Sequence, residues 1–233
     1  MTSTPPPKKS DLGVRAASAV VMLAVTGTAL WLGGWAWTLF VGLVAFGVFH
    51  EWQRLTQRIA RTLGLRMLWS IGGMAYVGVA TATLLFLRNT PGLGLLGVIL
   101  VVLPVIATDI GAYFAGRAIG GPKIAASISP SKTWAGLVGG MLGAGTVLAL
   151  AVRFLGDGAV APGNLALYFL AGAIMAVVAQ AGDFFESWMK RRAGVKDSGK
   201  LIPGHGGLFD RVDGLLAVLF VLGVAMLATR GLG

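Results

Sequence analysis

Residues 187–213 read SWMKRRAGVKDSGKLIPGHGGLFDRVD, a polar segment that separates two long apolar runs at 163–185 and 212–230. The segment holds nine charged residues and a histidine in a chain that is otherwise mostly apolar. Each apolar run has the length of about 20 residues that a membrane-spanning helix needs. Because charge near a bilayer is costly, a dense charged segment between two spans indicates a functional site. Its mixture of lysine, arginine, aspartate and glycine suits a polyphosphate held by cations and a metal ion.

The composition of the whole chain extends this pattern. Of 233 residues, 56% are hydrophobic and 12% are charged, whereas a soluble domain carries about 25% charged residues. We therefore predict an all-α fold, a polytopic transmembrane helical bundle of about seven spanning segments. Some segments are expected to be broken, and the fourth, which contains Pro104 and Asp109, is expected to be broken or kinked. Residues 1–13 are expected to be a disordered cytoplasmic leader, and residues 14–233 a single integral membrane domain. The expected spans cover residues 14–33, 35–52, 67–87, 92–117, 134–154, 163–185 and 212–230.

The distribution of charge predicts the orientation of these spans. With a cytoplasmic N-terminus, 16 of the 19 basic residues and eight of the nine acidic residues fall on the cytoplasmic side. Basic residues gather there in membrane proteins, which explains the formal charge of +10 without a nucleic acid partner. That rule does not cover the acids, whose position suits a cation-dependent site. The chain has no cysteine and two histidines, which excludes disulfides and thiolate catalysis and argues against a histidine-rich metal site.

Other segments have a structural interpretation. Residues 51–66 place basic residues at helical spacing with apolar ones between, which fits an interfacial helix on anionic lipid and an ordinary basic loop equally well. The steps Gly136-x-x-x-Gly140 and Gly139-x-x-x-Gly143 have the spacing that lets membrane helices pack closely, and we assign them no catalytic role. His50, beside Glu51 at the end of the second span, is interpreted as an interfacial residue outside the site.

The first group of candidate site residues lies at the cytoplasmic end of the sixth span. Asp183, Glu186, Ser187 and Lys190 are three and four residues apart, which puts them on one face of a helix. A pair between Glu186 and Lys190 at a helix end is sufficient to explain that glutamate. Asp183 lies deeper, just after the apolar run, and needs a cation or a metal ion as its partner.

Asp210 and Asp213 form the second group. A D-x-x-D step at a helix start is explained on its own by capping and by the helix dipole. Here it follows the turn Pro203–Gly207, PGHGG, whose glycines let backbone N–H groups face an anion before a helix N-terminus that attracts phosphate. Two carboxylates beside such a turn suit Mg²⁺, which takes oxygen ligands from one or two carboxylates, substrate phosphates and water. His205 is expected to hydrogen-bond a phosphate or to organise the turn.

A third group is basic, and a fourth precedes the fifth span. Alone, the basic group would be an ordinary cytoplasmic loop, but its interleaving with Asp197 and glycines favours phosphate binding. The fourth group comprises Asp109, an acid near a helix end, and the polar turn SPSKT at 129–133. Neither G-x-x-x-x-G-K-[ST] nor G-x-S-x-G occurs, which excludes a P-loop and the usual serine-hydrolase signal. The basic group consists of Lys190, Arg191, Arg192, Lys196 and Lys200.

Together these segments resemble the signature of phosphatidate cytidylyltransferases, also called CDP-diacylglycerol synthases. Residues 109–117 are similar to the family's D-x-x-A-Y-x-x-G-R element, and residues 129–136 to its S-P-x-K-T-x-x-G element. One departure is Ala135, because the family usually has glutamate after the tryptophan, so no role for that acid carries over. The resemblance covers residues 109–214. Within 187–213 the matching positions are Ser187, Met189, Lys190, Arg191, Lys196, Asp197, Pro203, His205, Gly206, Gly207, Asp210, Arg211 and Asp213.

The resemblance implies a homodimeric enzyme of the cytoplasmic (inner) membrane, with a cytoplasmic catalytic face formed by 109–136 and 183–214. It implies the reaction of CTP with phosphatidic acid to CDP-diacylglycerol and pyrophosphate in phospholipid biosynthesis, with Mg²⁺ and with K⁺ allowed as a second ion. Asp183 and Asp210 would hold the metal, with Asp213 as a further ligand. The expected catalytic residues are Lys132, Ser187, Lys190, Arg191, Lys196, Asp197, His205 and Arg211. The expected substrate- and cofactor-binding residues are Gly204, Gly206, Gly207 and Asp109.

Two other functions fit the composition. A transporter would also carry buried acids and Gly-rich spans, but transporters often show an inverted repeat and a midplane site. This chain shows no repeat, and its polar residues gather at one face. A CTP-dependent lipid-alcohol kinase, which is similar to this family, would transfer a phosphoryl rather than a cytidylyl group.

Overall fold

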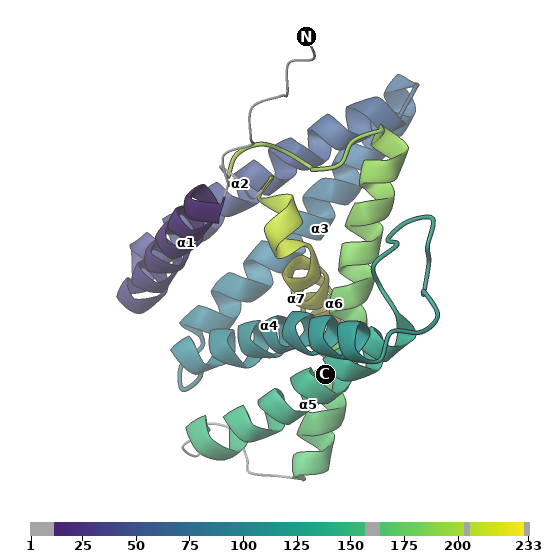
Figure 1. The fold of residues 1–233 in the computed structure, drawn as a ribbon. Helices are drawn as coiled ribbons and strands as arrows, with labels where there is room; N and C mark the ends of the chain where they lie inside the picture. The colour runs from purple at the N-terminus through teal and green to yellow at the C-terminus, as the bar shows by residue number, and fades with distance from the viewer. Residues whose placement is uncertain (1–11, 157–163, 203–205, 231–233) are drawn as a thin grey trace.

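The computed structural model describes residues 12–156, 164–202 and 206–230, and in these residues it contains seven α-helices and no β-strand (Figure 1). All seven are long and apolar enough to cross a membrane, which confirms the predicted polytopic α-helical class and indicates an integral membrane protein. The helices are α1 (Leu12–Leu32), α2 (Gly34–Ile59), α3 (Leu63–Asn89), α4 (Gly94–Ala118), α5 (Trp134–Leu155), α6 (Leu165–Ala193) and α7 (Phe209–Arg230). Almost all of the predicted leader lies outside the described residues.

Two helices continue furthest past the predicted ends of their spans. α2 continues to Ile59 and α6 to Ala193, so α6 has 29 residues and a length of about 44 Å, more than the hydrocarbon core of a bilayer. The polar ends remain helical because both pack against the segment between α6 and α7. The first half of the 51–66 segment is therefore the end of α2, which is neither a separate interfacial helix nor a loop. α6 stops at Gly194, whose φ of 68° is the left-handed conformation that ends many helices.

The expected break in the fourth span is not found. α4 is a continuous helix from Gly94 to Ala118 with Pro104 inside it, and Pro104 is fully buried. Proline removes one backbone donor, but in a membrane bundle neighbouring groups compensate for this loss. Separately, the Thr108 hydroxyl, one turn further along the helix, donates to the Pro104 carbonyl at 2.9 Å.

Small residues bring α4 and α5 into close contact. A Cβ added to Gly139 would lie 2.6 Å from the carbonyl oxygen of Gly111, and one added to Gly143 would lie 2.9 Å from that of Ala107. These distances leave no room for a side chain, which confirms the structural role predicted for the G-x-x-x-G steps. The contact holds the end of α4 beside the start of α5, where the polar connection 119–133 leaves and returns.

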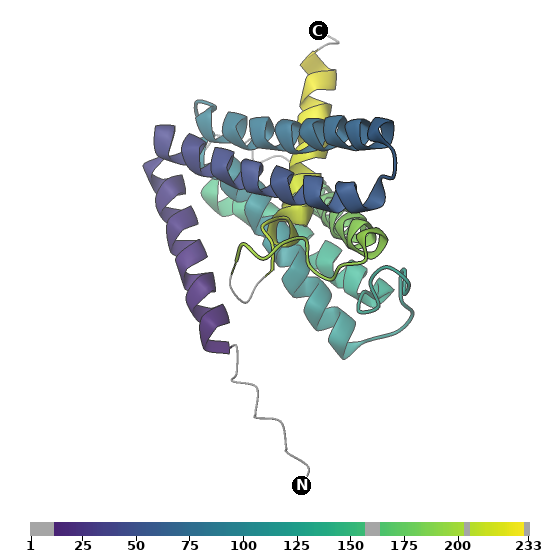
Figure 2. The same cartoon turned by 90° about the horizontal axis from the view of Figure 1, so that it is seen from above.

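The main apolar core gathers around Trp52 of α2 and the first half of α7. The Trp52 ring contacts Trp69, Tyr76, Phe185 and Phe209, and its indole N–H donates to the Trp69 carbonyl at 2.9 Å. α1 lies at the edge of the molecule, where it packs on α2 (Figure 2). The aromatic core fixes the ends of α2, α6 and α7 relative to one another.

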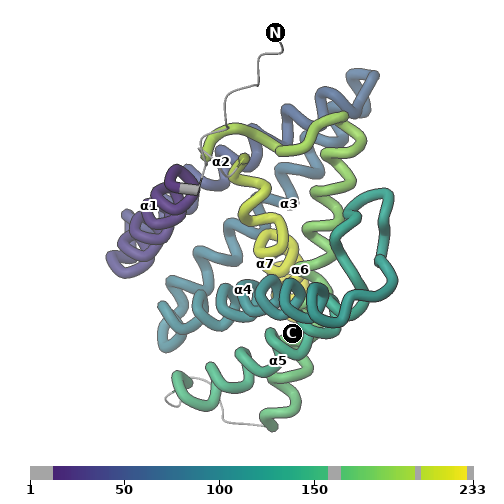
Figure 3. Tube along the Cα trace, in the orientation of Figure 1, coloured from purple at the N-terminus to yellow at the C-terminus, as the bar shows by residue number. Residues whose placement is uncertain are grey.

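The helices alternate in direction, so that polar connections gather on one side. In Figure 1, α2 and α6 end toward the upper right and α4 ends at the right, while α3 and α4 connect toward the lower left. The trace in Figure 3 shows the connection from α6 to α7 running along the end of α2. The connection from α4 to α5 lies on the same side, and these segments carry the predicted site residues.

Candidate active site

The polar end of α6 presents the predicted face toward α7 and the 119–133 connection. The Ser187 hydroxyl donates to an oxygen of Asp183 at 3.4 Å, one turn away. α7 approaches this face closely, because a Cβ added to Gly182 would lie 2.7 Å from the carbonyl oxygen of Asp213. Small residues at the helix crossing therefore bring the acids of α6 and α7 together.

Lys190 joins the two helices through a buried ionic cluster. Its ammonium pairs with Glu186 on α6 and with Asp210 on α7, the latter at 2.7 Å. The side chains of Glu186 and Asp210 are only 1% and 6% exposed, and the lysine is the cation that both acids share. The predicted Glu186–Lys190 pair exists, but it is a buried element of the site rather than a surface pair at a helix end.

Asp210 orders the segment that leads into α7. Its Oδ2 accepts hydrogen bonds from the backbone N–H of Ser198 and of Gly207, each at 2.9 Å. Gly206 precedes this contact with a φ of 85°, which favours glycine. The Gly207 amide therefore binds the protein's own carboxylate, which differs from the phosphate cradle expected of this turn. Gly204 and His205 lie outside the described residues.

Glu51 is a site residue that the sequence interpretation missed. Its side chain is fully buried, and it accepts hydrogen bonds from the amides of Leu208 and Phe209 at 3.1 and 2.9 Å. The Ser198 hydroxyl lies 2.8 Å from Glu51 and 2.9 Å from Asp210, so one hydroxyl bridges two carboxylates. Glu51 thus binds the first amides of α7, where a helix N-terminus attracts negative charge.

Lys132 comes to the site from the connection between α4 and α5. Thr133 caps α5 by accepting a hydrogen bond from the Gly136 amide at 3.0 Å, which sets the path of the residue before it. The Lys132 ammonium then forms an ion pair with Asp183 and lies 4.8 Å from the centre of the Phe184 ring. Asp183 therefore has the cationic partner that its position required.

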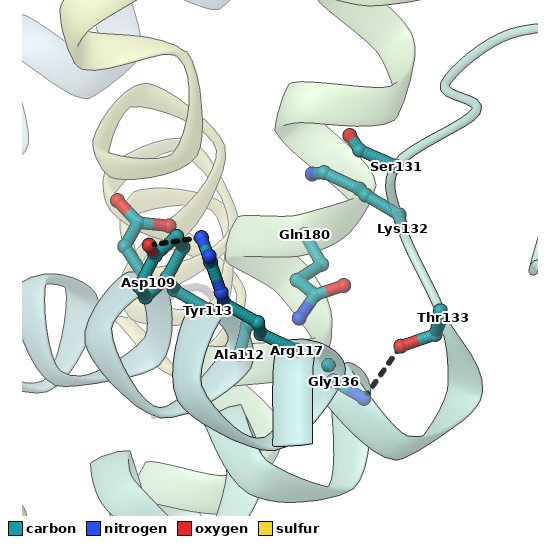
Figure 4. A pocket seen from close by; sticks show the side chains of 10 residues that line it. Asp109, Ala112, Tyr113, Arg117, Ser131, Lys132, Thr133, Gly136 and Gln180 are labelled. Carbon is teal, nitrogen blue, oxygen red and sulfur yellow. Dashed lines mark hydrogen bonds between the residues drawn. The ribbon is translucent and has the colours of Figure 1, made fainter. Parts of the chain in front are cut away.

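A cavity of about 370 Å³ opens beside this ion pair (Figure 4). α4 contributes Asp109, Tyr113 and Arg117 to one wall, and Lys132 lies on the opposite wall. Arg117 donates to the Tyr113 hydroxyl at 3.1 Å. The cavity falls within the usual size range of small-molecule sites, roughly 300–1,000 Å³. It combines two cations with one carboxylate and has a glycine-lined floor at Gly136.

Three aspartates share the electrostatic environment of this cavity. Asp183 interacts electrostatically with both Asp109 and Asp213, and Lys132 offsets part of their charge. In the described part of the chain, no three acids or histidines are grouped as the full ligand set of a metal ion. Mg²⁺ needs only one or two carboxylates when substrate phosphates and water complete its shell, so oxygen donors of this kind fit it. The Mg²⁺ site stays a prediction.

The remaining predicted residues lie around this centre. Arg191 donates from Nε to the Ile128 carbonyl at 3.3 Å and ties α6 to the 119–133 connection. Lys196 and Asp197 line a second cavity beside the end of α2. Arg211 is exposed in the first turn of α7. Ala135, the departure from the family pattern, follows the first residue of α5, close to the cavity.

Comparison with known proteins gives this geometry its context. The sequence pattern of the cytidylyltransferase family matches residues 65–229, most of the chain. The chain belongs to the cytidylyltransferase family. A phosphatidate cytidylyltransferase of Brucella melitensis is 34% identical over 91% of this chain and 92% of its own length. One of Rickettsia bellii is 33% identical over 92% of this chain and 90% of its own length.

Membership of the cytidylyltransferase family confirms the predicted resemblance and the predicted class of enzyme, a nucleotidyltransferase that uses CTP. The matched region includes both predicted catalytic segments but begins after α2. Glu51 therefore reaches the site from a part of the chain that the family pattern does not include. The signal that could have revealed it is the one that indicated Asp183, an acid at the end of a long apolar run.

Proposed function

We propose that the chain is a phosphatidate cytidylyltransferase of phospholipid biosynthesis. A phosphate oxygen of phosphatidic acid attacks the α-phosphorus of CTP, the bond from that phosphorus to the bridging oxygen breaks, and pyrophosphate leaves with its electron pair. The product is CDP-diacylglycerol. The observation that carries the proposal is the Lys132–Asp183 pair at the edge of an open cavity that also holds Arg117 and Asp109.

The residues of the site neutralise and position anions in this mechanism. The phosphate monoester of the lipid is ionised near neutral pH, so the reaction needs no strong base. Repulsion between two anions opposes their approach, and charge develops on the leaving pyrophosphate. Lys132 and Arg117 face the cavity and would offset both effects, while the buried Lys190 cluster holds α6 and α7 in register. Lys196 and Arg191 would add positive charge around the triphosphate.

Asp183, Asp210 and Asp213 are the proposed carboxylates for Mg²⁺, with K⁺ as a second ion. When bound, Mg²⁺ would neutralise charge on phosphate oxygens. Asp183 suits this role best, since its side chain is 34% exposed beside the cavity. Asp210 is 6% exposed and already accepts several hydrogen bonds, so it would hold the site together even without the ion.

The proposed setting is the cytoplasmic membrane, with the site facing the cytoplasm and the enzyme working as a homodimer without a nucleic acid partner. Support comes from the bias of basic residues toward the connections that carry the site. Lipid tails would stay in the bilayer while the phosphate headgroup reaches the site from the side.

The test uses CTP labelled at either the α- or the γ-phosphate with purified protein in detergent and phosphatidic acid. Label from the α-phosphate should enter the lipid, and it should stop doing so when EDTA removes divalent ions. Transfer of the γ-label instead would identify a lipid kinase, and transfer of neither label would contradict the proposal. Asp183→Asn should abolish the α-label transfer while the protein still inserts and folds.

A further inference from the structure

A second cavity, of about 300 Å³, is lined by Ser198, whose hydroxyl contacts Asp210 of the buried lysine cluster. One wall is the end of α2 and the other is the first part of the connection between α6 and α7. These walls are more than 130 residues apart in sequence, and both are basic. The charged residues that line the cavity are Arg54, Arg58, Lys196, Asp197 and Lys200.

The four cations of this cavity outnumber the one acid among its lining residues. In the described residues, all ion pairs involve Lys132 or Lys190, and none involves a cation of this cavity. Asp197 is the only acid in the lining. Like charges that converge on one hollow repel one another, and an anion bound between them would relieve that repulsion. A basic loop that only sets membrane orientation has no need to gather its charges around a cavity.

The cavity is directly connected to the site. Ser198 lines it, and the same residue donates to Asp210 through its backbone N–H at 2.9 Å. One face of α2 carries Glu51, Arg54 and Arg58, which are at positions i, i+3 and i+7. Glu51 binds the connection between α6 and α7, and the two arginines line the cavity. Ser198 therefore lies between an anion in the cavity and the Asp210 carboxylate that pairs with Lys190.

We propose that this cavity is a phosphate-binding subsite in which Arg54 and Arg58 of α2 act together with Lys196 and Lys200. The inference rests on the proposed function, because it assigns the subsite to a phosphate-bearing substrate of that reaction. Arginine offers paired donors to phosphate oxygens, and lysine adds point charges. The phosphate comes either from the nucleotide or from the lipid headgroup. Arg54 and Arg58 precede the region that matches the family pattern.

The test compares Arg54→Gln/Arg58→Gln with the control Arg61→Gln/Lys123→Gln. Both remove two positive charges from exposed residues near the same side of the molecule, but only the first pair lines the cavity. Binding of CTP, cytidine and inorganic pyrophosphate is measured by calorimetry on the purified full-length protein. The rate of α-label transfer is measured against the phosphatidate content of phosphatidylcholine nanodiscs.

A nucleotide phosphate in the subsite predicts that the cavity variant loses about tenfold or more in affinity for CTP and pyrophosphate, with cytidine binding unchanged. A lipid phosphate predicts unchanged CTP affinity and about a tenfold rise in the phosphatidate content needed for half-maximal rate. Lys200→Gln, on the opposite wall, should shift the same quantity in the same direction. If Arg54→Gln/Arg58→Gln fails to fold, the single variant Lys200→Gln still tests the subsite.

The inference is overturned when the cavity variant and Lys200→Gln both match the control in every one of these measurements. Failure of the proposed function has a different signature, since the unmodified protein would then transfer no α-label to lipid. In that case the pyrophosphate titrations still decide whether the cavity binds phosphate.

Discussion

Lys132 and Lys190 bind acids in environments of different polarity. Lys132 pairs with Asp183, whose side chain is 34% exposed beside an open cavity. Lys190 pairs with Glu186 and Asp210, which are 1% and 6% exposed. An exposed acid that loses its partner is hydrated, whereas a buried acid that loses its partner remains uncompensated. The two lysines should therefore differ in what their removal does.

Lys190→Met should destabilise the protein by about 3 kcal/mol or more, because it leaves two buried acids without the cation that they share. Lys132→Met should lower stability by about 1 kcal/mol or less and still remove most of the activity. Thermal unfolding in detergent measures the stability of the two variants, and α-label transfer measures their activity. Similar melting temperatures for Lys190→Met and Lys132→Met would contradict the distinction. Lys190→Arg, which retains a cation, should lose much less stability than Lys190→Met.

Glu51→Ala should destabilise the segment before α7 by about 2 kcal/mol or more, since two amides would lose their acceptor in a buried position and the Ser198 hydroxyl would keep only Asp210. Turnover should fall with it, because Asp210 is held by the same segment. Gln57→Ala, an exposed change in the same helix, is the matched control. Hydrogen exchange at residues 198–209 locates the effect, and unchanged exchange in this segment would contradict the role of Glu51.

At the scale of elements, the cavity depends on how closely α4 approaches α5. Asp109, Tyr113 and Arg117 lie on α4, while Lys132 precedes α5. The two helices meet through glycines, so their separation sets the width of the cavity. A packing change one or two turns away should therefore reach the site without altering any charged residue.

Gly139→Ala tests this dependence against Gly78→Ala. Both glycines are inside helices, so both changes gain about 1 kcal/mol in helix propensity. A Cβ at Gly139 meets Gly111 at 2.6 Å, whereas one at Gly78 has no heavy atom within 4 Å. Gly139→Ala should lower both the melting temperature and the turnover, and Gly78→Ala should lower neither. Equal behaviour would show that the α4–α5 contact does not control the site.

At the scale of the whole molecule, the alternation of seven helices decides which connections share a membrane face. The chain has no cysteine, so single cysteines report accessibility without background. In intact cells, a membrane-impermeant maleimide should label Asn89→Cys, on the predicted outer face. It should label Arg61→Cys and Ser127→Cys only after permeabilisation. Labelling of residue 61 or 127 in intact cells would contradict the predicted cytoplasmic site.

The sequence alone determined the all-helical membrane class, the number of spans and the enzyme family. Long apolar runs set the first two through length and composition, and these are local properties. The same information placed Asp183, Glu186, Ser187 and Lys190 on one helix face, because the spacing of three and four residues is fixed by the helix.

Only the tertiary structure decided how these residues are partnered. Glu51 and Ser198 are 147 positions apart, and no local pattern predicts that a hydroxyl joins Glu51 to Asp210. Helix continuity through Pro104 was likewise decided by packing, as was the extension of α2 and α6 beyond their apolar runs. The physical reason is that burial and ion pairing depend on which helices meet, and that is settled by contacts between segments far apart in the chain.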